Sequence, residues 1–82
     1  MPLYFFHVCH IHHQRFDVDG LDLPDVEAAW HEATTSTGEL LKDLGGGLRP
    51  GQDWSMQVAD EFKNTLFEIR IEPISHVEID SE

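Results

Sequence analysis

Histidine and cysteine side chains crowd the N-terminal part of the chain, where His7, Cys9, His10, His12 and His13 lie close together. Imidazole and thiolate groups are good ligands for zinc, copper or nickel. On an extended strand His10 and His12 point to the same face, close enough to chelate one ion. We therefore take His10, His12 and His13 as candidate metal ligands, with zinc or nickel as the ion and Cys9 or His7 assisting.

The same residues also fit a solvated polar hairpin that happens to be rich in histidine. Their spacing matches no closed tetrahedral motif, and a second group of ligands is missing unless the fold brings His31 or His76 close. The expected topology gives no reason for that approach. The polar hairpin is therefore the interpretation that we favour.

The stretch Asp17–Asp22 places three carboxylates around Gly20, an arrangement similar to a calcium-binding loop. An EF-hand loop needs an acidic first position and a glutamate at the twelfth. When Gly20 is aligned with the loop glycine, Arg15 takes the first position and Val26 the last. The match fails, and we interpret the stretch as an acidic turn that leads into a helix.

The residue types of a cysteine nucleophile with a base are present in Cys9, His7 and Asp17. Nothing in the sequence orients them, and an isolated thiol in an aromatic strand is usually a small core residue. The glycines at 45–47 follow a predicted helix, and no Lys-Ser or Lys-Thr comes after them, which excludes a phosphate-binding loop. We therefore favour a non-enzymatic protein and name no catalytic residue.

One helix is predicted from Asp25 to Leu44, because the side chains of one face recur at the three-and-four spacing of a helix. These side chains are Val26, Ala29, Trp30, Ala33, Thr37, Leu40, Leu41 and Leu44. Asp25 is placed to cap the first turn with its carboxylate. Gly45 ends the helix, since glycine adopts the left-handed conformation without steric penalty.

Strands are predicted where aromatic and β-branched residues cluster or alternate with polar ones. The four predicted strands cover residues 3–11, 14–18, 54–59 and 65–72. The elements then follow the order ββαββ in a single α+β domain over residues 1–82. A right-handed crossover gives a four-stranded antiparallel sheet of order 2-1-3-4, with the helix packed on one face. Residues 73–82 form either a short edge strand or a frayed tail.

The opposite face of this sheet is expected to keep an apolar patch. The residues that line it are Phe5, His7, Cys9 and Leu66. A partner subunit could bury such a patch.

The chain is strongly acidic, with a formal net charge of −11 and only five Lys and Arg residues. This charge repels phosphate groups, so we expect binding neither to nucleic acid nor to a membrane. An acidic surface instead complements a basic protein partner, with an attraction that weakens as salt rises.

The expected compartment is the cytoplasm. Cys9 is the single cysteine, which excludes an internal disulfide. The apolar run Leu3–Cys9 is too short to cross a bilayer and lacks the flanks of a signal peptide.

Several stretches resemble a small bacterial family of unknown function, DUF6894. They are Met1–Val8, Asp19–Ala29, Glu32–Ala33, Glu39–Leu41 and, more loosely, Val58–Glu61. The resemblance implies a bacterial, cytosolic, stand-alone domain, but no reaction and no catalytic residues. The chain departs from the family pattern at residues 10–13, where histidines replace an acidic turn that contains glycine. A role for these histidines would therefore be particular to this protein.

These observations favour a protein-protein interaction module that associates with itself as a homodimer formed by a sheet edge or a sheet face. The small core, the strand that is apolar on both sides and the lack of an assembled active site motivate this hypothesis. The alternative is a metal-binding protein that uses the histidine-rich turn of the first hairpin.

Overall fold

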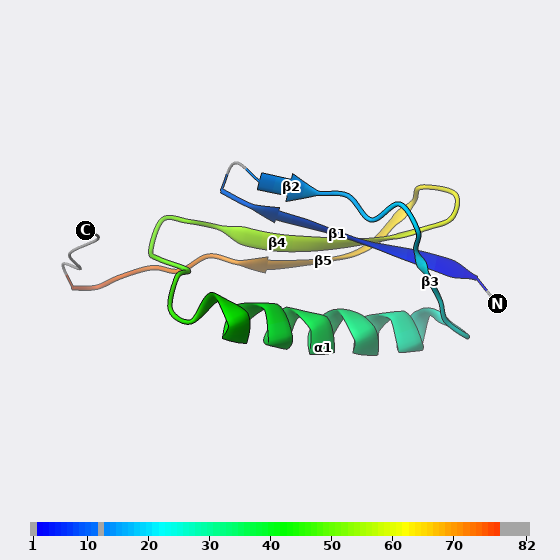
Figure 1. Cartoon of the computed structure of the whole chain (residues 1–82), viewed down its shortest axis with the longest axis horizontal. Coiled ribbons are helices and arrows are strands. Elements are labelled where there is room, and N and C mark those ends of the chain that lie inside the picture. The colour runs from blue at the N-terminus through cyan, green and yellow to red at the C-terminus, as the bar shows by residue number, and fades with distance from the viewer. Residues whose placement is uncertain (1, 12, 78–82) are drawn as a thin grey trace.

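The computed structural model describes residues 2–11 and 13–77, and it places one helix against one antiparallel sheet (Figure 1). The elements in chain order are β1 (Leu3–His10), β2 (His13–Arg15), β3 (Leu21–Asp22), α1 (Val26–Leu44), β4 (Trp54–Asp60) and β5 (Thr65–Ile71). The α+β class, the single helix and the antiparallel sheet are confirmed. No helix in the described ranges is long and apolar enough to cross a membrane.

The helix α1 has the ends that the sequence predicts. Asp25 caps it, because one carboxylate oxygen accepts a hydrogen bond from the Ala28 N–H at 2.9 Å. Gly45 ends it in the left-handed conformation with φ of 56°, and its N–H donates to the Lys42 carbonyl at 3.1 Å. Both ends satisfy backbone groups that a helix leaves without internal partners.

The sheet differs from the predicted ββαββ arrangement and its order 2-1-3-4, because Leu21–Asp22 forms the additional short strand β3. The strand order is β2-β1-β4-β5, and β3 pairs with the start of β1. Leu23 precedes Pro24, which disfavours helical geometry and keeps the chain extended. The Leu23 N–H then donates to the Pro2 carbonyl at 3.1 Å and continues this pairing.

Strand β2 is also shorter than predicted, since it ends at Arg15 and not at Val18. At the C-terminal side of the sheet, residues 72–77 form no strand. The predicted choice between an edge strand and a tail for residues 78–82 lies outside the described residues.

The core lies between α1 and one face of the sheet. Its buried side chains are Tyr4, Ala29, Ala33, Trp54, Met56 and Val58. Ala29 and Ala33 let the helix approach the central strands closely. Met56 and Val58 fill the space between the helix and the sheet. Thr37, which is also buried, directs its hydroxyl at the Met56 sulfur at 3.8 Å.

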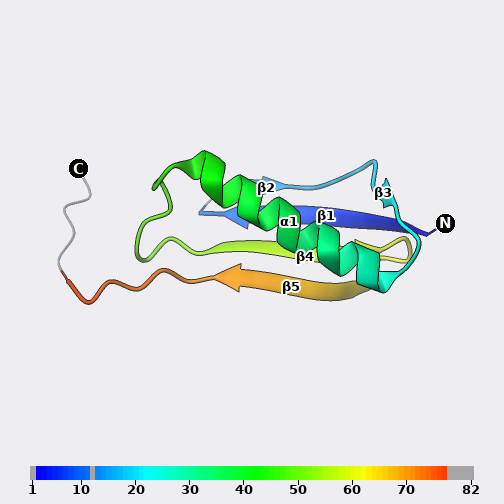
Figure 2. The same cartoon turned by 90° about the horizontal axis from the view of Figure 1, so that it is seen from below.

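Figure 2 shows that α1 crosses the sheet diagonally, from β5 at the start of the helix towards β2 at its end. Near its first turns Trp30 packs on Phe67 of β5, with ring centroids 5.2 Å apart. The C-terminal half of the helix lies away from β5 (Figure 2), and Ile69 and Ile71 at the end of this strand are only half-buried.

Candidate interaction surface

The two outer edges of the sheet differ in whether their outward backbone groups have partners within the chain. On the β1 edge, β2 pairs with the end of the strand and β3 with its beginning, which leaves a gap around Phe6. The carboxylate of Asp17 fills this gap, because its Oδ2 accepts a hydrogen bond from the Phe6 N–H at 3.2 Å. A side chain here replaces a backbone carbonyl of a neighbouring strand.

Asp17 is held in place by a local turn. Its second oxygen, Oδ1, accepts from the N–H groups of Asp19 at 3.2 Å and Gly20 at 3.1 Å. Its own N–H donates to Nδ1 of His7 at 3.1 Å. This bond pulls residue 17 out of the ladder, which explains why β2 stops at Arg15.

The surroundings of Asp17 favour its charged form. Partial burial raises the pKa of the carboxyl, but the N–H groups of Gly20, Phe6 and Asp19 and the nearby His7 ring outweigh it. The pKa of Asp17 is therefore lowered from its ordinary value. An ionised carboxylate is thus the resident acceptor at this edge.

Gly20 allows the turn to press against the sheet. Its φ is +76°, and a Cβ atom built on it would lie 2.9 Å from Cε2 of Phe5. Both the backbone conformation and the space favour glycine at this position. The same segment brings Phe16 edge-on to His7, with ring centroids 5.5 Å apart. The β1 edge is therefore closed by the chain's own residues.

The β5 edge has no such closure in the described part of the chain, where β5 ends the strand path. Along a strand of an antiparallel sheet, the backbone N–H and C=O groups of successive residues point alternately to one side and to the other. Asp60 of β4 donates its N–H to the Asn64 carbonyl, and Phe67, Ile69 and Ile71 follow in register with β4. The backbone N–H and C=O groups of Glu68 and Arg70 consequently point outward.

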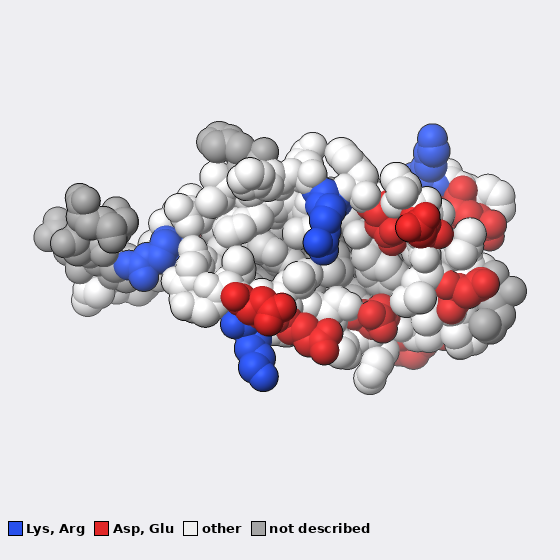
Figure 3. Space-filling view, viewed as in Figure 1, with Lys and Arg blue, Asp and Glu red and all other residues white. Residues whose placement is uncertain are grey.

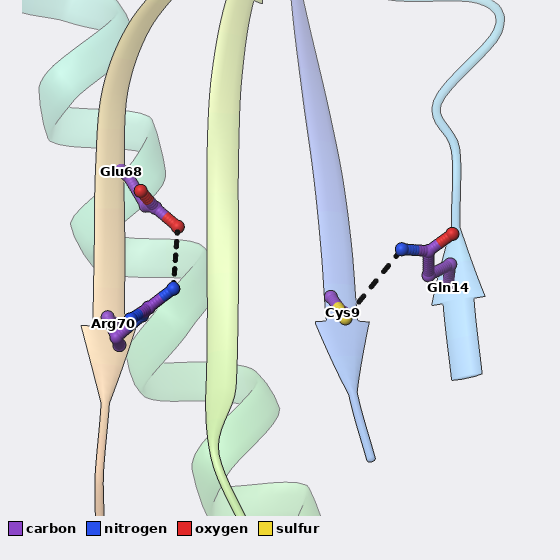
Figure 4. A network of polar contacts seen from close by, with 4 residues as sticks. All are labelled: Cys9, Gln14, Glu68 and Arg70. Atoms are coloured by element: carbon purple, nitrogen blue, oxygen red, sulfur yellow. Dashed lines mark hydrogen bonds and ion pairs between the residues drawn. The ribbon is translucent and has the colours of Figure 1, made fainter. Parts of the chain in front are cut away.

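The side chains of β5 present a different character on each face. Glu68 and Arg70 lie on the face away from the helix, where their charged groups are 3.7 Å apart (Figure 4). Both are accessible, with 39% and 64% of the side-chain surface exposed respectively. On the helix side, Phe67, Ile69 and Ile71 are only half-buried. The strand thus offers free backbone groups flanked by apolar side chains and a balanced charge pair.

The open face of the sheet is apolar at one end, where Phe5, His7 and Ala59 line a common hollow, and polar further along. One shallow hollow of about 220 Å³ is lined mainly by polar side chains, among them Gln14, Ser55 and Gln57. Cys9 lies beside it, 4.0 Å from the amide nitrogen of Gln14 (Figure 4). Leu66, which was expected on this face, packs against the core cluster. The predicted apolar patch is therefore interrupted.

The structure describes two of the three histidines predicted as metal ligands, His10 and His13. His10 pairs with His13 across the first hairpin, and both line a hollow beside the end of α1. Nε2 of His10 is buried and has no hydrogen-bond partner. His12 lies outside the described residues, and His7 is engaged with Asp17. Among residues 2–11 and 13–77, no three His, Cys, Asp or Glu side chains are grouped to hold a metal ion.

The nucleophile drawn from Cys9, His7 and Asp17 is not assembled either. Nδ1 of the His7 ring accepts from the backbone N–H of Asp17, so it donates no hydrogen bond to the Asp17 carboxylate. The carboxylate oxygens of Asp17 accept from backbone N–H groups. The geometry therefore gives the thiol of Cys9 no oriented base.

Acidic side chains outnumber basic ones in this chain, 16 to 5. Figure 3 shows them gathered at the end of the molecule that carries β3 and along the helix, whereas basic side chains are scattered singly. The mixed pair on β5 differs from these single-sign areas.

Sequence reasoning missed both edge features. The Asp-x-Asp-Gly turn was a signal for an Asp side chain that bonds backbone groups two and three residues on. For β5, the signal was a pair of opposite charges two residues apart on the last strand before Pro73.

The family model described as a domain of unknown function, DUF6894, matches residues 3–72, from the first residue of β1 to just past β5. No curated protein and no solved structure matches the chain.

Proposed function

Since the chain belongs to the DUF6894 family, which is described only as a domain of unknown function, we propose its function from its surface. It is a non-enzymatic protein-interaction module that associates with a second copy of itself through the free edge of β5. The observation that supports this proposal is the contrast between a closed β1 edge and an open β5 edge.

Strand addition is the mode of contact that suits β5. An exposed edge offers a row of unpaired backbone donors and acceptors, and another strand satisfies them directly. Pairing at this edge also covers part of Ile69 and Ile71, whose burial favours association.

The net charge of −11 opposes the approach of two copies. At physiological ionic strength, charges more than about 8 Å apart are largely screened, so the local charge at the contact matters most. On β5 that local charge is balanced, because Glu68 and Arg70 cancel. The acidic helix surface remains available for a basic protein partner, which is a further part of this proposal.

The test is sedimentation equilibrium of the wild-type chain beside Arg70→Pro and Arg70→Ala. The Arg70 N–H points outward, so proline removes a donor from the free edge without breaking a bond to β4. We expect a wild-type dimer, weaker association for Arg70→Ala and at least tenfold weaker association for Arg70→Pro. Circular dichroism checks that both variants fold. A wild-type chain that stays monomeric at high concentration, or a folded Arg70→Pro chain that dimerises normally, contradicts the proposal.

Metal binding at the first hairpin is the second candidate, supported by the unpartnered Nε2 of His10 beside His13. Zinc or nickel bound there would satisfy that nitrogen. Native mass spectrometry after addition of each metal tests it on the double variant His10→Ala, His13→Ala. A control double variant, His31→Ala with His76→Ala, retains the hairpin. Equal metal uptake by both variants removes this candidate.

A further inference from the structure

We infer that β5 pairs with β5 of a second copy in one particular antiparallel register, in which the two Ile69 residues lie opposite each other at a two-fold axis. This inference rests on the proposed function and names its geometry. A two-fold axis perpendicular to the sheet relates the two strands, so both helices lie on the same side of one continuous sheet.

The hydrogen-bonding pattern limits the possible registers. Residues with outward backbone groups must face outward residues of the other strand, since only these carry free donors and acceptors. On β5 the central outward residues are Glu68 and Arg70. Two-fold pairing centred on these two residues places the axis at Glu68, at Arg70 or between them at Ile69.

Charge selects among these three positions. An axis at Glu68 sets this residue against the partner's Glu68, and an axis at Arg70 sets that residue against the partner's Arg70. Both contacts join like charges, which is destabilising for residues directly opposite. With the axis at Ile69, Glu68 faces the partner's Arg70 and Arg70 faces the partner's Glu68. The ion pair within each strand then extends into a group of four alternating charges.

The apolar side chains fit the same register. On the helix side, Ile69 meets the partner's Ile69 and Phe67 meets the partner's Ile71. Ile69 forms a non-hydrogen-bonded pair, in which the Cα atoms are about 4.5 Å apart and side chains pack closely. The diagonal course of α1 keeps the helix away from the end of β5 (Figure 2), where Ile69 and Ile71 are half-buried and keep exposed surface for this contact. The register shift in the β4–β5 pairing before Phe67 and the proline at 73 bound the segment that can pair.

Charge reversal tests the register. Glu68→Arg places arginines opposite arginines at both ion pairs, and Arg70→Glu places glutamates opposite glutamates. We expect each variant alone to dimerise roughly ten- to a hundredfold more weakly than the wild type. An equimolar mixture of the two restores association as a heterodimer, because both cross-strand pairs become attractive again. The double variant Glu68→Arg, Arg70→Glu also restores a homodimer.

The matched variants separate register from overall charge and from folding. Glu68→Arg makes the chain less acidic, so general repulsion alone would strengthen its dimer, opposite to the expected loss. Recovery in the mixture excludes misfolding of either variant. With the axis at Glu68, Arg70→Glu would leave dimerisation unchanged. With the axis at Arg70, Glu68→Arg would strengthen it by facing the partner's Glu72. Either result overturns the register.

A disulfide provides the second measurement. In a Cys9→Ser background, Ile69→Cys should oxidise to a covalent dimer, while Phe67→Cys in the same background should not. A wild-type dimer that forms without cross-linking at residue 69, together with normal dimerisation of both charge variants, overturns the register and leaves the proposed function intact. A monomeric wild type overturns both.

Discussion

The two edges of the sheet face the same physical problem, unpaired backbone groups, and solve it differently. At the β1 edge one ionised side chain, Asp17, accepts a bond from Phe6 and two more from its own turn. At the β5 edge the described chain supplies no acceptor for Glu68 and Arg70. A short polar turn can therefore close an edge within one molecule, whereas an open edge leaves closure to another chain.

Removing the closing carboxylate should have the largest effect. Asp17→Ala leaves three backbone N–H groups without their acceptor. Charge-assisted hydrogen bonds stabilise most when they are buried, and these are partly accessible to solvent. We therefore expect a loss of about 1–3 kcal/mol in unfolding free energy. Urea denaturation measures it. Asp17→Asn keeps one carbonyl acceptor and should lose less; equal stability of Asp17→Ala and wild type would contradict the closure.

Gly20→Ala should destabilise the same edge through a steric clash. The new Cβ meets the Phe5 ring at 2.9 Å in a backbone conformation that L residues avoid, so we expect a loss of about 1–2 kcal/mol. Gly51→Ala is the matched control, because φ is +84° there but no atom lies within 4 Å of the added Cβ. Thermal unfolding of both should show the larger loss at residue 20; equal losses would mean that contact with Phe5 is unimportant.

The closure should also depend on pH. The pKa of Asp17 is lower in the folded chain than its ordinary value, so the carboxylate stabilises the fold above the unfolded pKa of about 3.9. This contribution is lost as the pH falls through the folded pKa. The stability difference between wild type and Asp17→Ala, measured by urea denaturation, should shrink as the pH falls from neutral to strongly acidic values. A difference that stays constant would show that the charge of Asp17 contributes nothing.

The sequence predicted the parts of the fold that local signals determine. Asp25 and Gly45 mark the helix ends through their own chemistry. A cluster of aromatic and β-branched residues marks β1, and alternation marks β4 and β5. The strand β3 has only two residues and exists because Leu21 meets Tyr4 in space, which no local pattern encodes. Likewise, the bond from Asp17 to Phe6 joins residues far apart in the chain.

The candidate surface also combines features that the local sequence determines with features that only the packed sheet determines. The charges at residues 68 and 70 are visible in the sequence, but whether their strand is central or at an edge depends on the packing of the whole sheet. The hairpin around residues 11–13 was predicted as a turn, while the pairing of His10 with His13 required the structure.

Hydrogen exchange should show the smallest change and compares both edges in one sample. The amide of Phe6 is bonded to Asp17 within the molecule, so its protection should not depend on protein concentration. The amides of Glu68 and Arg70 point outward, so they should exchange quickly in dilute protein and slow down as the dimer forms. Residue-resolved exchange by NMR at two concentrations measures this. Concentration-dependent protection at Phe6, or its absence at Glu68 and Arg70 in a dimeric sample, would move the interface from β5 to the other side of the sheet.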